Sequence, residues 1–94
     1  MHYVLYCLDK SGHGRIRADN RNAHLDYLKS FGEAVFAAGP LLDDAGVNMI
    51  GSLLILDLPD RAAVDRFLAG DPYGQAGLFA SVKVSPWRKA IPQG

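Results

Sequence analysis

The chain has 94 residues and a formal net charge of zero, with 49% hydrophobic and 21% charged residues. This size and balance predict one domain, residues 1–94, with a limited core, and they exclude the strongly basic surface typical of nucleic-acid binding. No apolar run approaches the roughly 20 residues of a membrane-spanning helix, and the N-terminus lacks a basic region followed by an apolar stretch, so we expect a cytoplasmic protein without a membrane partner.

The first predicted element is a strand. Residues 2–8 are rich in Tyr, Val and Leu and contain no breaker, which indicates a strand buried on both faces. Cys7, the single cysteine, lies in this run and cannot form an internal disulfide, so we expect a buried, unreactive thiol. Residues 9–17 are rich in Gly, Lys, Arg and Ser and predict a mobile loop.

A helix is expected after this loop. It begins near residues 18–20, where Asp19 or Asn20 can cap the free amides, and it runs to about Phe31, with Gly32 at its end. Beside its apolar stripe lies a row spaced by four, three and four residues, formed by Arg17, Arg21, His24 and Leu28. His24 is therefore predicted at the edge of the apolar stripe.

Two strands and a second helix are predicted next. Residues 34–42 favour an edge strand, because Pro40 cannot donate a hydrogen bond to a neighbouring strand. Residues 49–58 show no alternation of polar and apolar residues, which indicates a central strand. Asp60 is a good helix cap, and Gly70 is expected in a left-handed conformation at the end of the helix.

The last strand is predicted over residues 78–87, where one side is largely polar and is formed by Phe79, Ser81, Lys83, Ser85 and Trp87. The resulting βαββαβ order is that of an α+β, ferredoxin-like fold, with a four-stranded antiparallel sheet and two helices on one face. Two helices cover one face only, yet two strands are apolar on both. We therefore expect a homodimer or a higher homo-oligomer to cover the second face.

A candidate site lies in the stretch Gly70 to Gly74, just after the second helix. The carboxylate of Asp71 there would face the negative end of the helix dipole, so it calls for a partner, and His24 is the candidate. The alternative is that Asp71 only caps its own turn before Pro72, where Asp is common without any chemistry.

The order and spacing of several short motifs resemble the YCII (YciI-like) family over nearly the whole chain. The motifs are Tyr3-Val4-Leu5-Tyr6, Arg17 and Arg21, His24-Leu25-Asp26-Tyr27-Leu28, Ala38-Gly39-Pro40-Leu41, Gly51-Ser52, Asp71-Pro72-Tyr73 and a closing strand near residues 82–87. The resemblance implies subunits paired as a dimeric α/β barrel, and a His and Asp site pair that corresponds to His24 and Asp71. One member of that family dehydrochlorinates a chlorinated hydroxyhydroquinone.

The residues themselves favour acid/base chemistry. Imidazole is a natural proton carrier at neutral pH, and a carboxylate on its other nitrogen orients it, so His24 and Asp71 are the candidate catalytic pair. Arg17 and Arg21 lie near the start of the first helix, where an anion such as a carboxylate, enolate or phenolate is favoured. The remaining candidates for substrate binding are Ser52 and Tyr73, as hydrogen-bond donors.

Each of these residues also has a structural interpretation, as a helix-edge histidine, solvated arginines, and packing or turn residues. The histidines, carboxylates and Cys7 show no metal-ligand spacing, and there is no phosphate-binding loop, so neither a metal nor a cofactor is expected. A haem with His24 as axial ligand is a minor alternative. Two functions remain open: a cofactor-free enzyme acting on a small cyclic or aromatic molecule, and a non-catalytic module that binds or senses a small molecule.

Overall fold

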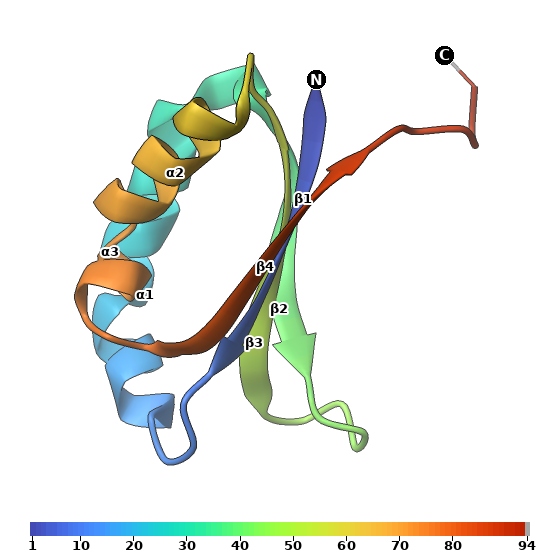
Figure 1. Ribbon diagram of the computed structural model, residues 1–94. Coiled ribbons are helices and arrows are strands. Elements are labelled where there is room, and N and C mark those ends of the chain that lie inside the picture. Colours follow the sequence, from blue (N-terminus) through green and yellow to red (C-terminus); the bar gives the residue numbers. More distant parts are fainter. Residues whose placement is uncertain (94) are drawn as a thin grey trace.

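The computed structural model describes residues 1–93 and has four strands, three α-helices and one turn of 3-10 helix (Figure 1). The elements are β1 (His2–Asp9), α1 (Gly14–Ser30), η1 (Gly32–Ala34), β2 (Val35–Leu42), β3 (Met49–Asp57), α2 (Arg61–Gly70), α3 (Pro72–Gln75) and β4 (Phe79–Trp87). All neighbouring strands are antiparallel, in the order β2-β3-β1-β4. The ferredoxin-like α+β fold is therefore confirmed, with β3 central and β2 at an edge. Within the described residues no helix is long and apolar enough to cross a membrane.

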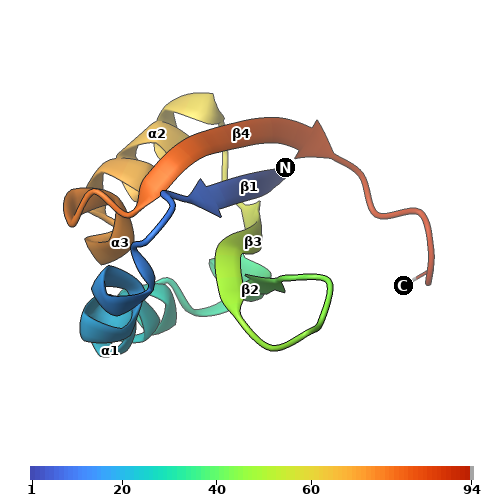
Figure 2. The ribbon, with the colours of Figure 1, turned by 90° about the horizontal axis from the view of Figure 1, so that it is seen from below.

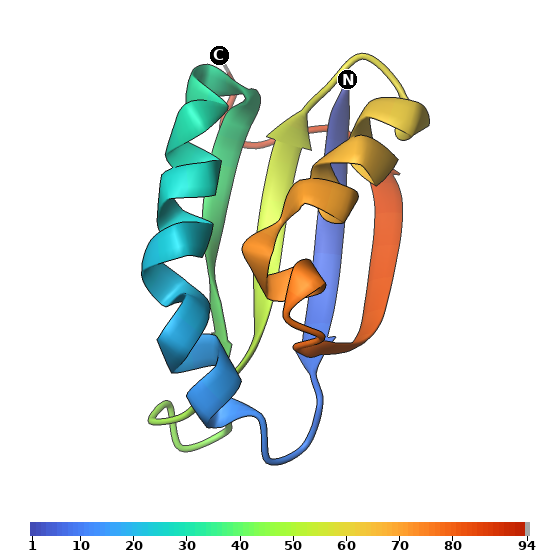
Figure 3. The same ribbon diagram turned by 90° about the vertical axis from the view of Figure 1, so that its left-hand side faces the viewer.

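All the helices lie on one face of the sheet (Figures 1 and 2). Seen from that side, α1 lies beside α2 and α3, and β3 is visible between them (Figure 3). The register places the pairs Tyr3 with Leu56 and Leu5 with Leu54 on this face. Together with Val64 and Phe67 of α2, these side chains form the centre of the core. Alternation along β1 and β3 thus directs one set of apolar residues toward the helices.

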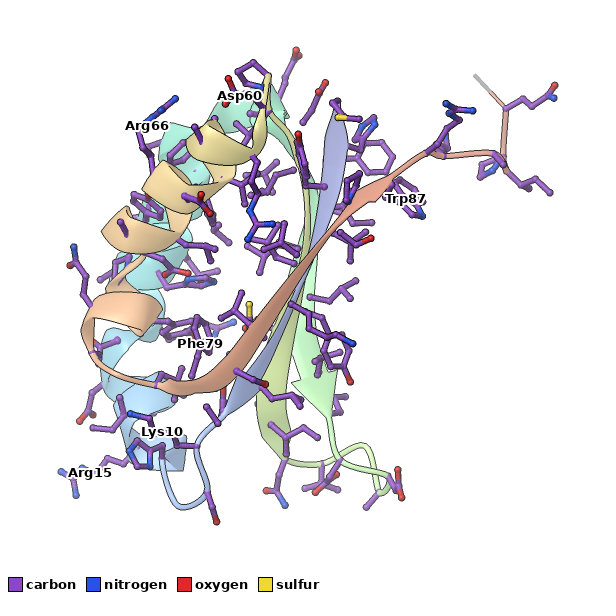
Figure 4. The ribbon with its side chains drawn as sticks, in the orientation of Figure 1. Lys10, Arg15, Asp60, Arg66, Phe79 and Trp87 are labelled. Carbon is purple, nitrogen blue, oxygen red and sulfur yellow. The ribbon has the colours of Figure 1, made fainter. Side chains whose placement is uncertain are left out.

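The opposite face, called the open face below, carries the other set of side chains. It includes the cross-strand pairs Val4 with Ile55 and Tyr6 with Leu53, together with Trp87, which lies on the side of the sheet away from the helices (Figure 4). No element of the described chain covers this face, and Tyr6 remains 41% exposed. Monomeric proteins rarely expose a large continuous apolar patch, so this face is a candidate contact surface.

The polar side predicted for the last strand is present, except at one residue. Ser81, Lys83 and Ser85 pair with open-face residues of β1, as expected. Phe79 was expected among them, but it packs on the core and lies on the helix side of the sheet (Figure 4). The reason is a register shift between Leu8 and Asp9, because an irregularity of this kind turns the side chains beyond it to the other face.

The predicted start of α1 is wrong by more than one turn. The helix begins at Gly14, its N-cap is His13, and this cap makes no side-chain hydrogen bond. Asp19 and Asn20 lie inside the helix instead of capping it. The expected mobile loop over residues 9–17 is reduced to residues 10–13, because Asp9 belongs to β1 and residues 14–17 belong to α1.

Gly70 is the last residue of α2, and it does not have the positive φ angle that was predicted. The reason for glycine here is a close approach. The Tyr27 side chain donates its hydroxyl hydrogen to the carbonyl oxygen of Phe67 at 2.8 Å, and a Cβ on Gly70 would lie 2.5 Å from that hydroxyl oxygen. The expected cap on α2 is confirmed, since Asp60 accepts a hydrogen bond from the amide of Ala63 at 2.9 Å.

We expect Gly51→Ala to destabilise the fold by about 2 kcal/mol or more. A Cβ at this position of β3 would overlap the backbone carbonyl oxygen of Cys7, which cannot rotate away. Gly39→Ala in β2 is the matched control, because a Cβ there meets nothing within 4 Å. Urea denaturation of both variants measures the difference, and an equal, small effect of the two changes would contradict this account of the strand contact.

Candidate functional site

The imidazole of His24 and the carboxylate of Asp71 meet beneath α1. His24 Nδ1 lies 2.8 Å from Asp71 Oδ1, so the contact predicted between these residues is confirmed. Both side chains are buried, with exposures of 6% for His24 and 1% for Asp71, whereas the sequence placed them outside the core. The buried contact is what an orienting carboxylate requires, because little water competes for either partner.

Asp71 also caps its own turn, which was the alternative interpretation of this residue. The same Oδ1 accepts a hydrogen bond from the amide of Tyr73 at 3.0 Å. This bond caps α3, a four-residue helix where the sequence predicted a loop. The two interpretations of Asp71 are therefore compatible. The backbone cap holds the carboxylate in place, and the fixed carboxylate then orients His24.

Tyr73 connects the two halves of the site. Its ring stacks on the imidazole of His24, with centroids 3.9 Å apart and planes at 14°. The guanidinium carbon of Arg17 lies 4.7 Å from the centroid of the same ring, within the range of a cation–π contact. Burial raises the pKa of the Tyr73 hydroxyl, while Arg17 and Arg21 act in the opposite direction. The phenol is therefore neutral at physiological pH and can donate a hydrogen bond.

Arg17 is held by an ion pair that no sequence pattern predicted. Its Nε lies 2.7 Å and its Nη2 2.9 Å from the two oxygens of Asp9, and the Nη2 also donates to the hydroxyl of Ser52 at 2.9 Å. Burial disfavours the charged guanidinium, but Asp9 more than offsets this and raises the pKa of Arg17. Asp9 was assigned to a loop, and no sequence pattern links the end of a strand to a helix residue eight positions later.

These residues border a cavity of about 200 Å³ between the sheet and the helices. Five of the six predicted site residues line it, and Asp71 lies behind His24. The polar lining consists of Arg17, Arg21, His24, Ser52 and Tyr73. The remaining wall is mainly apolar and comes from Leu25, Leu28, Ala38, Gly39, Pro40, Met49 and Leu54. An apolar wall with a few convergent polar groups is the usual form of a small-molecule site.

The second ring nitrogen of His24 is available to this cavity. Nε2 has no hydrogen-bond partner within residues 1–93. In these residues every fully buried side-chain nitrogen or oxygen has a partner, so Nε2 is not fully buried. Nε2 is therefore accessible from the cavity that His24 lines. An ionised carboxylate can only accept, so Nδ1 carries a proton toward Asp71, and Nε2 of the neutral ring has a free lone pair.

The thiol of Cys7 is close enough to this site for the charges of Asp71 and Arg17 to act on it. It is fully buried, as predicted, and burial together with the negative charge of Asp71 raises its pKa to about 12. The group is therefore a neutral thiol at physiological pH, and neutral thiols are poor nucleophiles. Among the described residues no group of three or more His, Cys, Asp or Glu side chains could hold a metal ion.

The fold and the site together define a class: a ferredoxin-like α+β domain with a buried His and Asp pair that faces a small cavity. The family model of the YCII-related domain, which describes the sequences of its members, matches residues 1–88, so the chain belongs to the YCII family. It is 30% identical to protein YciI of Escherichia coli O6:H1, over 97% of this chain and 100% of the relative. A protein of Haemophilus influenzae is 31% identical with the same coverage.

A solved structure supports the same assignment. It is the 5-chloro-2-hydroxyhydroquinone dehydrochlorinase TftG of Burkholderia phenoliruptrix AC1100, in complex with 2,5-dihydroxybenzoquinone. The two proteins are 34% identical and superpose with a TM-score of 0.88 over 96% of each chain. The fold of this chain is therefore the fold of a protein that binds a single-ring compound.

Proposed function

We propose that this protein is a small enzyme that needs no cofactor and catalyses proton transfer, elimination or isomerisation on a small cyclic or aromatic compound. His24 acts as the acid/base group and Asp71 orients it. The observation that carries this proposal is the 2.8 Å contact between His24 Nδ1 and the Asp71 carboxylate, which leaves Nε2 directed to the cavity. In this state the ring is ready to remove a proton.

The chemistry follows from that arrangement. Nε2 takes a proton from the substrate, and Asp71 stabilises the imidazolium that forms. In an elimination, the electron pair of the broken bond to hydrogen becomes a new double bond, and the leaving group departs with its own bonding pair. Overall, the substrate loses a proton and the leaving group, which together amount to one molecule of acid. The reaction therefore needs no oxidant or reductant. An isomerisation returns the proton to another atom of the substrate instead.

The size of the cavity supports a small substrate. About 200 Å³ is below the range of roughly 300 to 1,000 Å³ for sites that hold drug-sized molecules, so a single ring is the appropriate size. The similar protein TftG is named as a dehydrochlorinase of 5-chloro-2-hydroxyhydroquinone, which is one such ring. Elimination is therefore the first reaction to test.

The test measures chloride release from 5-chloro-2-hydroxyhydroquinone, incubated anaerobically with the purified protein. We expect release above the rate without protein, and little or no such increase with His24→Asn, which lacks the group that takes the proton. A panel of halogenated quinols and small lactones extends the assay if this compound is not turned over. Binding of these rings without any conversion would contradict the enzyme proposal and favour the alternative, a non-catalytic module that binds or senses a small molecule.

We also propose that the protein is a homodimer whose subunits pair through their open faces, as in a dimeric α/β barrel. The apolar pairs on that face have no cover within the described chain. Light scattering should give about twice the 10.2 kDa mass of one chain, and Ile55→Lys, which places a charge on the open face, should shift the protein toward the monomer. A monodisperse wild-type monomer at micromolar concentration would disprove the pairing.

A further inference from the structure

We propose that Arg21 selects ligands with an ionised oxygen, whereas the charge of Arg17, the other arginine of the cavity, is already paired with Asp9. This inference rests on the proposed small-molecule site and names the class of compound that the site prefers: a single apolar ring that carries an anionic oxygen at its edge. The sequence gives the two arginines the same role. The structure separates them.

The charge of Arg17 is already matched. Its bonds of 2.7 and 2.9 Å to Asp9 engage both oxygens of the carboxylate, and its third contact goes to Ser52. The side chains of both members of the pair are almost fully buried, with exposures of 6% and 7%. An arginine in a bidentate pair of this kind is neutralised locally. A ligand at Arg17 would therefore meet a cation whose charge is already balanced by Asp9.

The charge of His24 is matched in the same way. When Nε2 takes a proton, the positive charge of the ring faces the Asp71 carboxylate at 2.8 Å. After proton transfer the positive charge of His24 is therefore balanced by the negative charge of Asp71. The charges of Arg17 and Asp9 balance each other throughout. Neither pair leaves an excess positive charge for an anionic ligand.

Arg21 is different, because within residues 1–93 no carboxylate lies within 4.0 Å of its guanidinium nitrogens. It lines the cavity one turn before His24 on α1. Like Arg17, it acts against the burial that raises the pKa of the Tyr73 hydroxyl, so the two arginines are separated by their ion pairing and not by this effect. Among the described residues, Arg21 is thus the cation of the lining that has no carboxylate partner, and it can pair with an anionic group of a ligand.

The rest of the lining defines the other parts of the ligand. Leu25, Leu28 and Leu54 provide an apolar wall suited to a ring. An oxygen at the edge of that ring can reach Arg21, while Nε2 of His24 faces the reacting atom. Enols of quinones, phenols with acidic hydroxyls and aromatic carboxylates share this chemistry.

The experiment compares two rings of similar size, 2,5-dihydroxybenzoquinone, which is ionised at neutral pH, and hydroquinone, which is neutral. Calorimetric titration measures the affinity of each for the wild type and for Arg21→Gln. We expect the variant to lose roughly ten-fold or more in affinity for the ionised ring and little for the neutral one. Arg21→Lys should restore part of the loss, because it keeps the charge.

Arg15→Gln is the matched control, because Arg15 lies on the same helix, is 90% exposed and does not line the cavity. It should leave both affinities unchanged. An equal loss for both rings in Arg21→Gln, or an unchanged preference for the ionised ring, would overturn the inference. The titrations measure binding only, so a protein that never turns over these rings would refute the enzyme proposal and leave this result intact.

Discussion

Replacement of His24 should lower turnover by a factor of about 10² to 10⁴, because the group that moves the proton is lost. Two variants separate this effect from a loss of structure. His24→Ala removes the whole ring and leaves Asp71, which is 1% exposed, without its partner. His24→Asn is the sharper test, since its amide can still donate to Asp71 from the position of Nδ1 but offers nothing at Nε2. Initial rates at saturating substrate measure both.

Asp71→Asn should retain weak activity, because the imidazole is still present but held in the wrong orientation or tautomer. The expected rank of activity is therefore wild type, then Asp71→Asn, then His24→Asn. Circular dichroism of each variant checks that it remains folded. Full activity in His24→Asn would end the assignment of the proton carrier to this residue.

The largest effect on stability is expected at Asp9 and Arg17. Asp9→Ala leaves the Arg17 guanidinium buried at 5% exposure without its counter-charge, and breaking a buried pair from one side typically costs about 3 to 5 kcal/mol. The double replacement of Asp9 by Ala and Arg17 by Met removes both charges and should recover part of this loss. Urea denaturation of the single and double variants gives the free energy of unfolding for each.

The exposed pair of Arg61 with Asp65, at a similar distance of 3.1 Å, is the control. Both of its side chains are more than half exposed, so Arg61→Ala should not change stability measurably. A double variant as unstable as Asp9→Ala alone would show that the loss comes from packing of the side chains and not from the unpaired charge.

Sequence patterns alone determined the order of the main elements and the family. The continuous apolar runs at residues 2–8 and 49–58 predicted the two central strands, and Pro40 predicted an edge strand, because these signals depend on local hydrogen bonding and side-chain period. The motifs around His24 and Asp71 also identified two residues that the fold brings into contact across 47 positions.

Only the tertiary structure determined the beginning of α1, the position of Phe79 and the roles of the two arginines. Gly14 and its neighbours have the composition of a loop, and the first turn of the helix has no side-chain cap. The helix nevertheless begins there, and Arg17 in this turn is bound to Asp9 at the end of β1. Arg17 and Arg21 are equivalent in a helical row. They differ because Asp9, at the end of β1, lies beside Arg17 and not beside Arg21. This contact forms only when the sheet and the helix pack together, so a sequence pattern cannot reveal it.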